Sequence, residues 1–526
     1  MDNNHYDAIV VGSGLGGLTA GALYAQRGKR VLVLERHDKF GGAATVFNRM
    51  KMRIEAGLHE IDGLGENDIK AALWQELGLS SLLEPVPVCS LFAVLTDIQG
   101  PELVIPEGMG NARATFTRRF PQHAKSIRRY FRVIKQIHTS LHGLTRVRRD
   151  RSGWKPWLWP QLISHLWTVL QYNRTNLGEF LQSLFGNDED IKKLLCCNVT
   201  YYTHDPVNLS LMFYSAAQAS YHEGGGHYIR GGSQALSDAL IAIIEEAGGE
   251  ALRRRQVNEI LVEKERVSGV AHEYVPSLMK ERKGPPRDIQ LAFAPVIFGN
   301  AAPHILKELL PAEMRQGFFA PYRGREVSTS LWSLFLGFDC RPADFGVSNY
   351  STFIIPKRLS CLDSLPDMVR MMSQLPHGAA EAVCVFVDYD QIESGLNNDG
   401  RYLGVICGLD SIENWLKLDD EAYDRHRNAW ADALVAQLDS HFPGIARHVV
   451  YQDLATARTC RRFLNTPSGA VYGFVPPLPF IHGGGPDAST PVAGLYLASA
   501  FGSHGGGFTG AMLSGEQAAK QVLGEA

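Results

Sequence analysis

The fold is decided near the amino terminus by the stretch Ala8-Ile9-Val10-Val11-Gly12-Ser13-Gly14-Leu15-Gly16-Gly17. An apolar strand runs directly into a glycine-rich turn, and a helical segment follows the turn. A second apolar strand, Val31 to Leu34, comes next and is closed by Glu35. This order of strand, glycine turn, helix and strand is that of a dinucleotide-binding βαβ unit.

The glycines and the acid of this unit each have a physical task. Gly12 lets the chain turn sharply out of the strand, and Gly14 lets backbone N–H groups approach a pyrophosphate. Gly17 lets the helix pack closely on the sheet, and Glu35 stands where a carboxylate accepts hydrogen bonds from a ribose. The helix N-terminus adds partial positive charge for the phosphates. We therefore assign cofactor contacts here to Gly12, Ser13, Gly14, Gly16, Gly17, Glu35 and Arg36.

The composition excludes several classes of protein. The 526 residues suffice for more than one domain, and a net charge of −3 argues against a nucleic-acid binder. Eight scattered cysteines without a C-x-x-C motif favour reduced thiols in an intracellular protein. No apolar run reaches the roughly 18 residues of a membrane-spanning helix, and the first seven residues do not read as a signal peptide. We expect a cytoplasmic protein, either soluble or peripheral on the inner face of a membrane.

Further motifs resemble one family of flavoproteins. A second glycine turn, Phe40-Gly41-Gly42-Ala43-Ala44, follows Glu35 closely. The passage from Leu464 to Gly473 resembles the N-x-P-G-x-x-Y-G motif of carotenoid desaturases, and Ser503-His504-Gly505-Gly506-Gly507-Phe508-Thr509-Gly510 leads into a helix. Together these motifs resemble the FAD-dependent phytoene desaturase, carotenoid isomerase and retinol saturase-like family of the amine oxidase superfamily. Many relatives have an arginine where this chain has Ala43, so one phosphate contact of the family is missing.

The resemblance implies non-covalent FAD held by three separated blocks of sequence, roughly 7–65, 224–305 and 464–524. In the middle block a glycine pair, Gly231-Gly232, precedes a helix expected from Gln234 to Ala247, and the backbone of the strand at Val257 would contact the adenine. In the last block Ser499-Ala500 replace the Gly-Asp pair that is common in relatives. No cysteine occurs between residues 470 and 526, so a thioether flavin link has no candidate. The resemblance adds to the expected cofactor contacts Gly41, Gly42, Ala43, Val257, Ser499, Gly507, Phe508 and Thr509.

The chain is expected to form an α/β fold of three regions. A Rossmann-like FAD-binding domain of the GR2 type would be assembled from residues 1–67, 221–320 and 449–526. A largely helical region, 68–220, would face the substrate or a membrane. Alternating apolar runs predict an inserted mixed-sheet substrate domain at 321–448.

One segment of the helical region is strongly basic and rich in tryptophan. From Arg118 to Lys155 there are twelve Lys or Arg residues and one acid, Asp150. Trp154, Trp157, Trp159 and Trp167 accompany this run. Indole rings beside basic residues are typical of a membrane interface with anionic lipid. The alternative is a solvated helix face beside a Trp-rich packing motif inside the protein.

The expected chemistry is hydride movement between carbon and a flavin, which desaturates, saturates or isomerises double bonds of an apolar polyene or isoprenoid-like substrate. The substrate could be a free lipid or a group tethered to a carrier. The sequence has no separate second G-x-G-x-x-G unit for a nicotinamide, so electrons are expected to enter or leave through the substrate, a quinone or dioxygen. Nicotinamide stays an alternative, because it can reach some flavins without that motif. No metal site is expected. Candidate catalytic residues beside the glycine blocks are His59, His227, Tyr228 and His504, and a structural hydrogen-bonding role is the alternative for each histidine.

Two other functions remain open from the sequence. An amine or amino-acid oxidase could use the same fold, but would want an aromatic pair at the flavin and a pocket that reads charge. A non-catalytic prenyl-binding escort, resembling GDP dissociation inhibitors, keeps this architecture without using FAD. The intact glycine turn and Glu35 argue against the escort.

Overall fold

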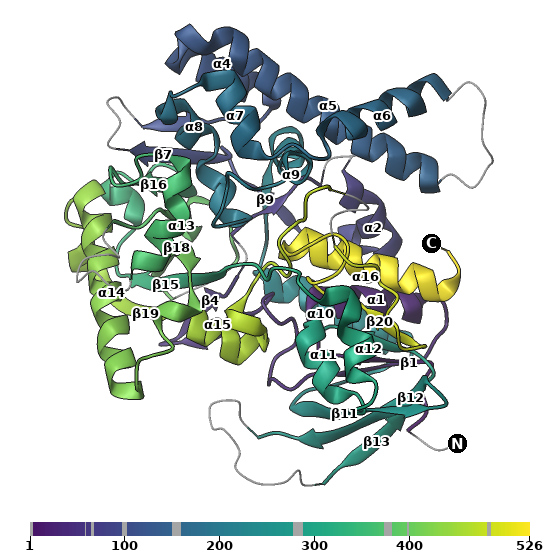
Figure 1. Cartoon of the computed structure of the whole chain (residues 1–526). Coiled ribbons are helices and arrows are strands. Elements are labelled where there is room, and N and C mark those ends of the chain that lie inside the picture. Colours follow the sequence, from purple (N-terminus) through teal and green to yellow (C-terminus); the bar gives the residue numbers. More distant parts are fainter. Residues whose placement is uncertain are drawn as a thin grey trace.

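The computed structural model describes residues 4–57, 59–64, 68–96, 102–149, 159–276, 288–372, 381–396, 399–480 and 485–525. Trp154 and Trp157 of the basic segment therefore lie outside the described residues. Figure 1 shows a parallel sheet with its helices at the lower right, a second sheet at the left, and a helical layer across the top. Within the described residues, no helix combines the length and apolarity needed to cross a membrane.

A five-stranded parallel sheet forms the cofactor-binding domain. Its strand order is β10-β2-β1-β14-β20, so strands from three separated parts of the chain lie side by side. All four residues of β1 and of β2 are buried, as expected for a parallel sheet covered on both faces. The strands are β1 (Ala8–Val11), β2 (Val31–Leu34), β10 (Glu250–Leu252), β14 (Ile297–Gly299) and β20 (Leu495–Leu497).

Alternate residues of β1 face two different layers. Ala8 and Val10 pack with the layer of α1 (Leu15–Gln26), α10 (Ser233–Glu246) and α16 (Gly507–Leu523). Ile9 and Val11 pack on the opposite face, against an antiparallel sheet and two short helices. These elements are β11 (Arg255–Glu263), β12 (Arg266–Tyr274), β13 (Gln290–Phe293), α11 (Pro303–Leu309) and α12 (Arg315–Phe319).

A seven-stranded mixed sheet forms the substrate side of the molecule, in the order β19-β15-β18-β17-β16-β7-β8. Only the β16–β7 pair is parallel. Trp332 and Leu334 pack toward α14 (Asp420–His441), whereas Leu331 and Phe335 face the interior of the protein. The strands are β7 (Phe92–Thr96), β8 (Leu103–Ile105), β15 (Ser330–Phe338), β16 (Ser351–Ile355), β17 (Cys384–Asp388), β18 (Tyr402–Asp410) and β19 (Val449–Ala455).

Two borders of the expected regions differ in the structure. β7 and β8 come from 68–220, the region expected to be largely helical, and β19 comes from the segment assigned to the FAD-binding domain. All three strands instead complete the mixed sheet, because β7 pairs with β16 and β19 pairs with β15. Sheet membership depends on these long-range pairings, which the local sequence does not contain.

The helical layer lies above both sheets in the view of Figure 1. Its helices are α2 (Ile69–Leu77), α3 (Leu79–Leu82), α4 (Met109–Arg119), α5 (Ala124–Arg149), α6 (Trp159–Tyr172), α7 (Leu177–Phe185), α8 (Glu189–Leu195) and α9 (Leu211–Gly224). Small sheets below this layer link it to the other domains. They contain β3 (Val46–Arg49), β4 (Met52–Glu55), β5 (Ile61–Asp62), β6 (Pro85–Pro87) and β9 (Gly226–Ile229). The remaining helices are α13 (Leu365–Met371) and α15 (Ala457–Leu464).

Candidate active site

One large cavity of about 2910 Å³ runs through the middle of the protein. Small-molecule sites typically have volumes of about 300–1,000 Å³, so this cavity has room for a cofactor and a substrate together. At one end is the cradle, which we define as Gly12–Gly16, Glu35, Arg36 and Gly41–Ala43. At the other end is the chamber, whose wall includes His59, Glu60 and the aromatic residues Tyr201, Tyr202, Phe213, Tyr221, Phe335 and Tyr472.

The cradle is built from two glycine turns that touch. Gly12 has a φ of +89°, a conformation that suits glycine, and Gly14 is the N-cap of α1. No side chain caps α1, so the N–H groups of its first turn are left for a ligand in the cavity. The N–H of Gly41 in the second turn donates to the carbonyl oxygen of Ser13, with an N···O distance of 3.0 Å. The two turns are therefore joined into one corner, where backbone N–H groups could bind an anion.

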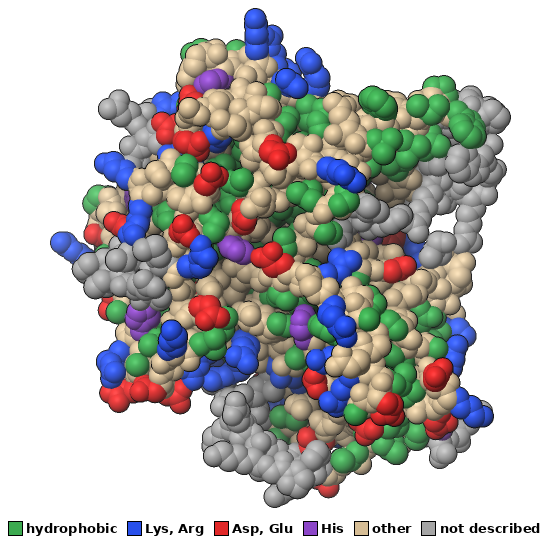
Figure 2. Space-filling view, viewed as in Figure 1, with side chains coloured by type: hydrophobic (Ala, Val, Ile, Leu, Met, Phe, Trp, Pro, Cys, Tyr) green, Lys and Arg blue, Asp and Glu red, His purple; other side chains and the backbone are tan. Residues whose placement is uncertain are grey.

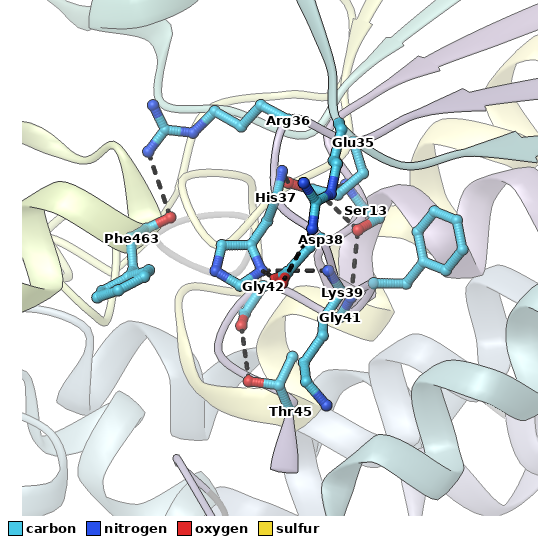
Figure 3. A network of polar contacts seen from close by, with 12 residues as sticks. Ser13, Glu35, Arg36, His37, Asp38, Lys39, Gly41, Gly42, Thr45 and Phe463 are labelled. Carbon is cyan, nitrogen blue, oxygen red and sulfur yellow. Dashed lines mark hydrogen bonds and ion pairs between the residues drawn. The ribbon is translucent and has the colours of Figure 1, made fainter. Parts of the chain in front are cut away.

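Glu35 is held at the edge of the cradle by three hydrogen bonds (Figure 3). Its Oε2 accepts from the N–H of Ser13 at 2.8 Å and from Ser13 Oγ at 2.6 Å. Its Oε1 accepts from the N–H of His37 at 2.8 Å. A carboxylate offers about four acceptor positions, so Glu35 can still accept a hydrogen bond from a ribose hydroxyl in the cavity that it lines.

Arg36 lines the cradle beside Glu35. Its guanidinium donates to the carbonyl oxygens of Arg462 and Phe463, which ties it to α15 (Figure 3). Burial lowers the pKa of Arg36 from its usual value, although the neighbouring Glu35 opposes this shift. The side chain is thus fixed on the cavity wall by contacts from the last block of sequence.

A second uncapped helix end lies farther along the cavity. α16 begins at Gly507 after the N-cap Gly506, without a side-chain cap, and Phe508 lines the cavity there. The Oγ1 of Thr509 donates to Oδ1 of Asp62 at 2.9 Å. Ser499 and Val257 also line the cavity, as predicted for contacts to the cofactor.

All but one of the predicted cofactor residues line this cavity. The exception is Gly17, which lies on the side of α1 that faces the sheet. A Cβ added there would meet Val10 Cγ1 at 2.8 Å and the Gly12 carbonyl oxygen at 2.9 Å. Gly17 therefore has the packing task proposed from the sequence.

The cavity fits a flavin-type dinucleotide on its own geometry. Two helix N-termini without side-chain caps open into it, and both can offer N–H groups and partial positive charge. Glu35 offers an acceptor at one end, and the backbone around Val257 forms the wall nearby. An extended ligand with a central anionic part would satisfy these groups together.

Two of the four predicted catalytic residues lie on the cavity wall. His59 lines the chamber, where burial lowers its pKa to about 4, and its Nδ1 is 3.5 Å from Tyr201 Oη. His59 is therefore a neutral imidazole at neutral pH. His504 also lines the cavity, and its Nδ1 is 2.8 Å from Ser503 Oγ. Both histidines have hydrogen-bonding partners that hold their rings.

The other two predicted catalytic residues, His227 and Tyr228, do not line this cavity. Both belong to β9, which pairs with β5 and β6. Tyr228 is completely buried, and its hydroxyl donates to Oε2 of Glu55 at 3.1 Å. The alternation of side chains along β9 directs this tyrosine into the core, so its role is structural.

Sequence reasoning missed Glu60, the acid next to His59. Glu60 lines the chamber, where its Oε1 accepts from Ser351 Oγ at 2.6 Å. Its Oε2 is 2.6 Å from the hydroxyl oxygen of Tyr221. Burial raises the pKa of Glu60 to about 7, against the opposing effect of these two hydrogen bonds. The only available signal was an acid beside a candidate histidine in a mostly apolar segment.

An ion cluster beside α16 was also missed. Lys70 is almost completely buried, and its Nζ lies 2.8 Å from Asp68 Oδ1 and 3.5 Å from Asp62 Oδ1. Burial raises the pKa of Asp62, but Lys70 and the hydroxyl of Thr509 more than offset it, so that pKa lies below its usual value. Asp62 is therefore a charged side chain that joins β5, at the cavity wall, to the first turn of α16.

Comparisons with known proteins agree with this arrangement. Residues 10–77 match the model of the NAD(P)-binding Rossmann-like domain. An all-trans-retinol 13,14-reductase from Macaca fascicularis is 24% identical over 93% of this chain and 81% of the relative. The chloroplastic prolycopene isomerase 1 of an Oncidium hybrid cultivar is 25% identical over 99% of this chain and 84% of the relative.

Solved structures share the fold. An oxidoreductase from Methanosarcina mazei has a TM-score of 0.62 at 15% identity, covering 98% of this chain and 99% of that structure. Wild-type putrescine oxidase bound to putrescine has a TM-score of 0.61 at 14% identity, with 99% of both chains covered. These matches confirm the predicted α/β fold. The chain is thus similar, over 93–99% of its length, to a retinol 13,14-reductase and a prolycopene isomerase, in agreement with the family resemblance predicted from its motifs.

Proposed function

We propose that the protein is an FAD-dependent oxidoreductase that changes the carbon–carbon double bonds of an apolar polyene or isoprenoid-like substrate. The observation that carries this proposal is the single cavity that joins the cradle to the aromatic chamber. Relatives named for retinol and prolycopene, two polyenes, support the same substrate class. A long apolar molecule in the chamber would lie in direct reach of a cofactor bound along the cradle and α16.

Non-covalent FAD is the cofactor that these residues suit. The first turn of α1 would hold the pyrophosphate, Glu35 the adenosine ribose, and the first turn of α16 the flavin ring. When bound, FAD supplies two-electron transfer to or from carbon, which no side chain can do. The last cysteine of the chain is Cys460, so the segment around α16 has no thiol for a covalent link.

The chamber residues would bind and orient the substrate. Aromatic rings of the wall, such as Phe335 of β15 and Tyr472, offer flat apolar surfaces to a conjugated chain. The walls also keep bulk water from the reacting carbons. An electron partner such as a quinone or dioxygen would complete each turnover, together with the substrate itself.

We also propose that the protein binds to membranes through the outer face of α6. The exposed residues Trp159, Ile163, Leu166, Trp167 and Leu170 recur at helical spacing and form an apolar face, with Trp167 68% and Leu170 69% exposed. Figure 2 shows hydrophobic side chains gathered in this region, at the upper right. Such exposure favours the membrane interpretation over the internal packing motif for the two described tryptophans.

The positive charge of α5 and the position of the cavity also support membrane binding at the outer face of α6. Arg128, Arg129 and Arg132 are exposed on α5, the helix that packs along α6, and they would attract anionic lipid. Other residues of this helix pair, including Leu141 and Val169, line the cavity. An apolar substrate leaving the lipid at α6 would therefore need to cross only this pair of helices.

The decisive experiment is anaerobic incubation of the purified protein with candidate polyenes, with the visible flavin absorbance and the product masses followed together. Bleaching or recovery of the flavin coupled to a polyene product that differs by two hydrogens, or by geometry alone, would support the proposal. A colourless protein that binds prenyl lipids would favour the escort. Peroxide formed only with amines would favour the amine oxidase.

A further inference from the structure

The hydrogen bonds around Glu60 specify its protonation state. The hydroxyl of Tyr221 lies 2.6 Å from Glu60 Oε2 and 2.8 Å from the carbonyl oxygen of Leu91. A tyrosine hydroxyl has one proton, so it can donate to only one of these two acceptors. If Glu60 were ionised, one buried pair of oxygens would face each other without a proton between them.

A neutral Glu60 completes the chain of hydrogen bonds. Ser351 Oγ donates to Oε1 of Glu60, the acid proton on Oε2 is donated to Tyr221, and Tyr221 donates to Leu91. Every donor and acceptor of this chain is then satisfied, as buried polar groups generally are. The backbone of Gly226 packs so closely that an added Cβ would lie 2.3 Å from Oε2, which holds the carboxyl in place.

The groups facing Glu60 do not favour its charged form. The titratable side chains that interact with it are His59, Tyr201, Tyr202, Tyr221, Tyr350 and Tyr389. Burial lowers the pKa of His59 to about 4 and raises the pKa of each tyrosine, so all are neutral near pH 7. The nearby cation Lys70 is already paired with Asp68 and Asp62.

We propose that Glu60 is the proton donor to one carbon of the substrate double bond, which makes the chamber suited to saturation of that bond. This inference rests on the proposed function. Saturation of one double bond adds a hydride, with its electron pair, to one carbon and a proton to the other. The hydride would come from flavin that a two-electron donor, such as a hydroquinone, has reduced beforehand. The acid O–H leaves its hydrogen bond to Tyr221 and breaks as the C–H bond forms. The Tyr221 hydroxyl then turns from Leu91 to donate to the resulting carboxylate, which is reprotonated from solvent.

The position of Glu60 suits this task. It precedes β5, and Asp62 at the end of β5 accepts the hydrogen bond from Thr509 in the first turn of α16. The acid is therefore fixed to the same element that meets the predicted flavin end of the cavity. Its partly exposed side chain belongs to the cavity wall, whereas Ser351 behind it is buried.

Glu60→Gln tests the inference without disturbing the fold. The amide oxygen can accept from Ser351, and the amide NH₂ can donate to Tyr221, as the neutral acid does. The variant has no transferable proton of comparable acidity. Asp388→Asn is the matched control, because Asp388 is completely buried with a pKa also raised by burial to about 7, but it does not line the cavity.

Three measurements on the flavin-loaded proteins decide the matter. Polyene reduction by chemically reduced enzyme in D₂O should place solvent deuterium on both carbons, because the transferable hydrogen of reduced flavin also exchanges with solvent, and Glu60→Gln should slow the reduction by about 10²–10⁴-fold. The wild-type rate should fall as the pH rises through about 7, whereas the slow residual rate of the variant should not. Infrared spectra should contain a carboxylic-acid carbonyl band that disappears in Glu60→Gln and fades over the same pH range.

The controls separate this inference from the function on which it rests. Asp388→Asn should lose a different acid band and keep the wild-type rate and pH profile. A Glu60→Gln variant with the wild-type rate and pH profile would overturn the inference. A wild-type protein that retains flavin but converts no polyene would instead reject the proposed function, while the infrared titration would still decide whether Glu60 is neutral.

Discussion

The cradle and the chamber are two ends of one cavity, but they are built in opposite ways. The cradle is formed by a short stretch of chain. It would offer a ligand mainly backbone N–H groups at glycine turns such as those of Gly14 and Gly41. The chamber collects side chains from the helical layer, the mixed sheet and the last block, such as Tyr201, Phe335 and Tyr472. Binding of a constant cofactor needs a fixed backbone, whereas choice of substrate is left to side chains.

The two acids of the cavity show the same contrast. Glu35 accepts three hydrogen bonds, two of them from backbone N–H groups, which is an arrangement that suits a carboxylate. Glu60 shares its Tyr221 partner with a carbonyl oxygen, which suits a neutral acid. The hydrogen bonds therefore suit Glu35 to accept a ligand hydroxyl as a carboxylate, and they suit Glu60 to donate a proton as a neutral acid.

The strongest way to break the comparison is Gly14→Val. An added Cβ would lie 2.6 Å from Nδ2 of Asn300, and the branched side chain would also block approach to the backbone of the turn. Such overpacking typically costs about 1–3 kcal/mol, so we expect FAD binding to weaken roughly a hundredfold. The purified variant should lose its visible flavin absorbance, measured per mole of protein.

Gly110→Ala is the control for this variant. Gly110 lies in α4, and an added Cβ there would meet nothing within 4 Å. Alanine in an exposed helix should stabilise the fold by about 0.4–1 kcal/mol and leave the flavin content unchanged. Full flavin occupancy in Gly14→Val would show that the cofactor does not lie along the first glycine turn.

A second test sharpens the contrast between the acids through the pH dependence of stability. Folding raises the pKa of Glu60 from 4.5 to about 7. The stabilisation that its proton gives is complete below pH 4.5 and is lost as the pH rises through about 7. The wild type should therefore lose up to roughly 3 kcal/mol relative to Glu60→Gln across this interval.

Urea unfolding of both proteins between pH 4.5 and 8 measures this difference, because the other titrating groups are common to both. A constant difference in the free energy of unfolding would mean that folding does not change the affinity of Glu60 for its proton. In that case the acid at the chamber would resemble Glu35 more than the hydrogen bonds indicate.

Much of the cradle could be predicted from the sequence, because local backbone rules fix it. A glycine turn between an apolar strand and a helix places Gly14 at a helix N-terminus, and the strand that follows places Glu35 beside it. The chamber obeys no such local rule. No sequence pattern predicts that Glu60 and Lys70 are buried. Glu60 acquires its properties from a residue distant in the chain, Tyr221, whereas Lys70 pairs with its sequence neighbours Asp62 and Asp68.

The positions of Tyr228 and β19 also depend on long-range strand pairing. Tyr228 stands near a glycine block, but the pairing of β9 with β5 and β6 decides that its side chain enters the core. Likewise, β19 follows the substrate region in sequence, but pairing with β15 assigns it to the mixed sheet. Motifs therefore predicted residues of the cradle, whereas long-range packing decides which side chains line the chamber.

Glu35→Ala probes how far the cradle depends on its one acid. The change leaves the buried N–H of Ser13 and the N–H of His37 without their acceptor. Each unsatisfied buried donor costs about 1–3 kcal/mol, so we expect a lower free energy of unfolding in urea and weaker retention of FAD. Glu35→Gln keeps an acceptor oxygen for Ser13 and should lose less stability. Equal stability of both variants and the wild type would mean that the backbone alone holds the turn.

The smallest expected effect concerns the outer wall of the chamber, where α5 and α6 separate the cavity from the surface. Replacing Arg128, Arg129 and Arg132 by glutamine should weaken binding to anionic vesicles by about 1 kcal/mol per charge removed, and salt should weaken wild-type binding in the same way. Trp167→Ser should weaken binding to neutral and anionic vesicles alike, because it removes apolar contact rather than charge. Flotation or co-sedimentation with vesicles of each composition measures both effects.

Gly110→Ala on α4 is again the control, since it changes neither charge nor the apolar face. Wild-type protein that binds neither type of vesicle at low salt would assign the apolar face of α6 to something other than lipid, and the chamber would then have to receive its substrate from solution or from a carrier.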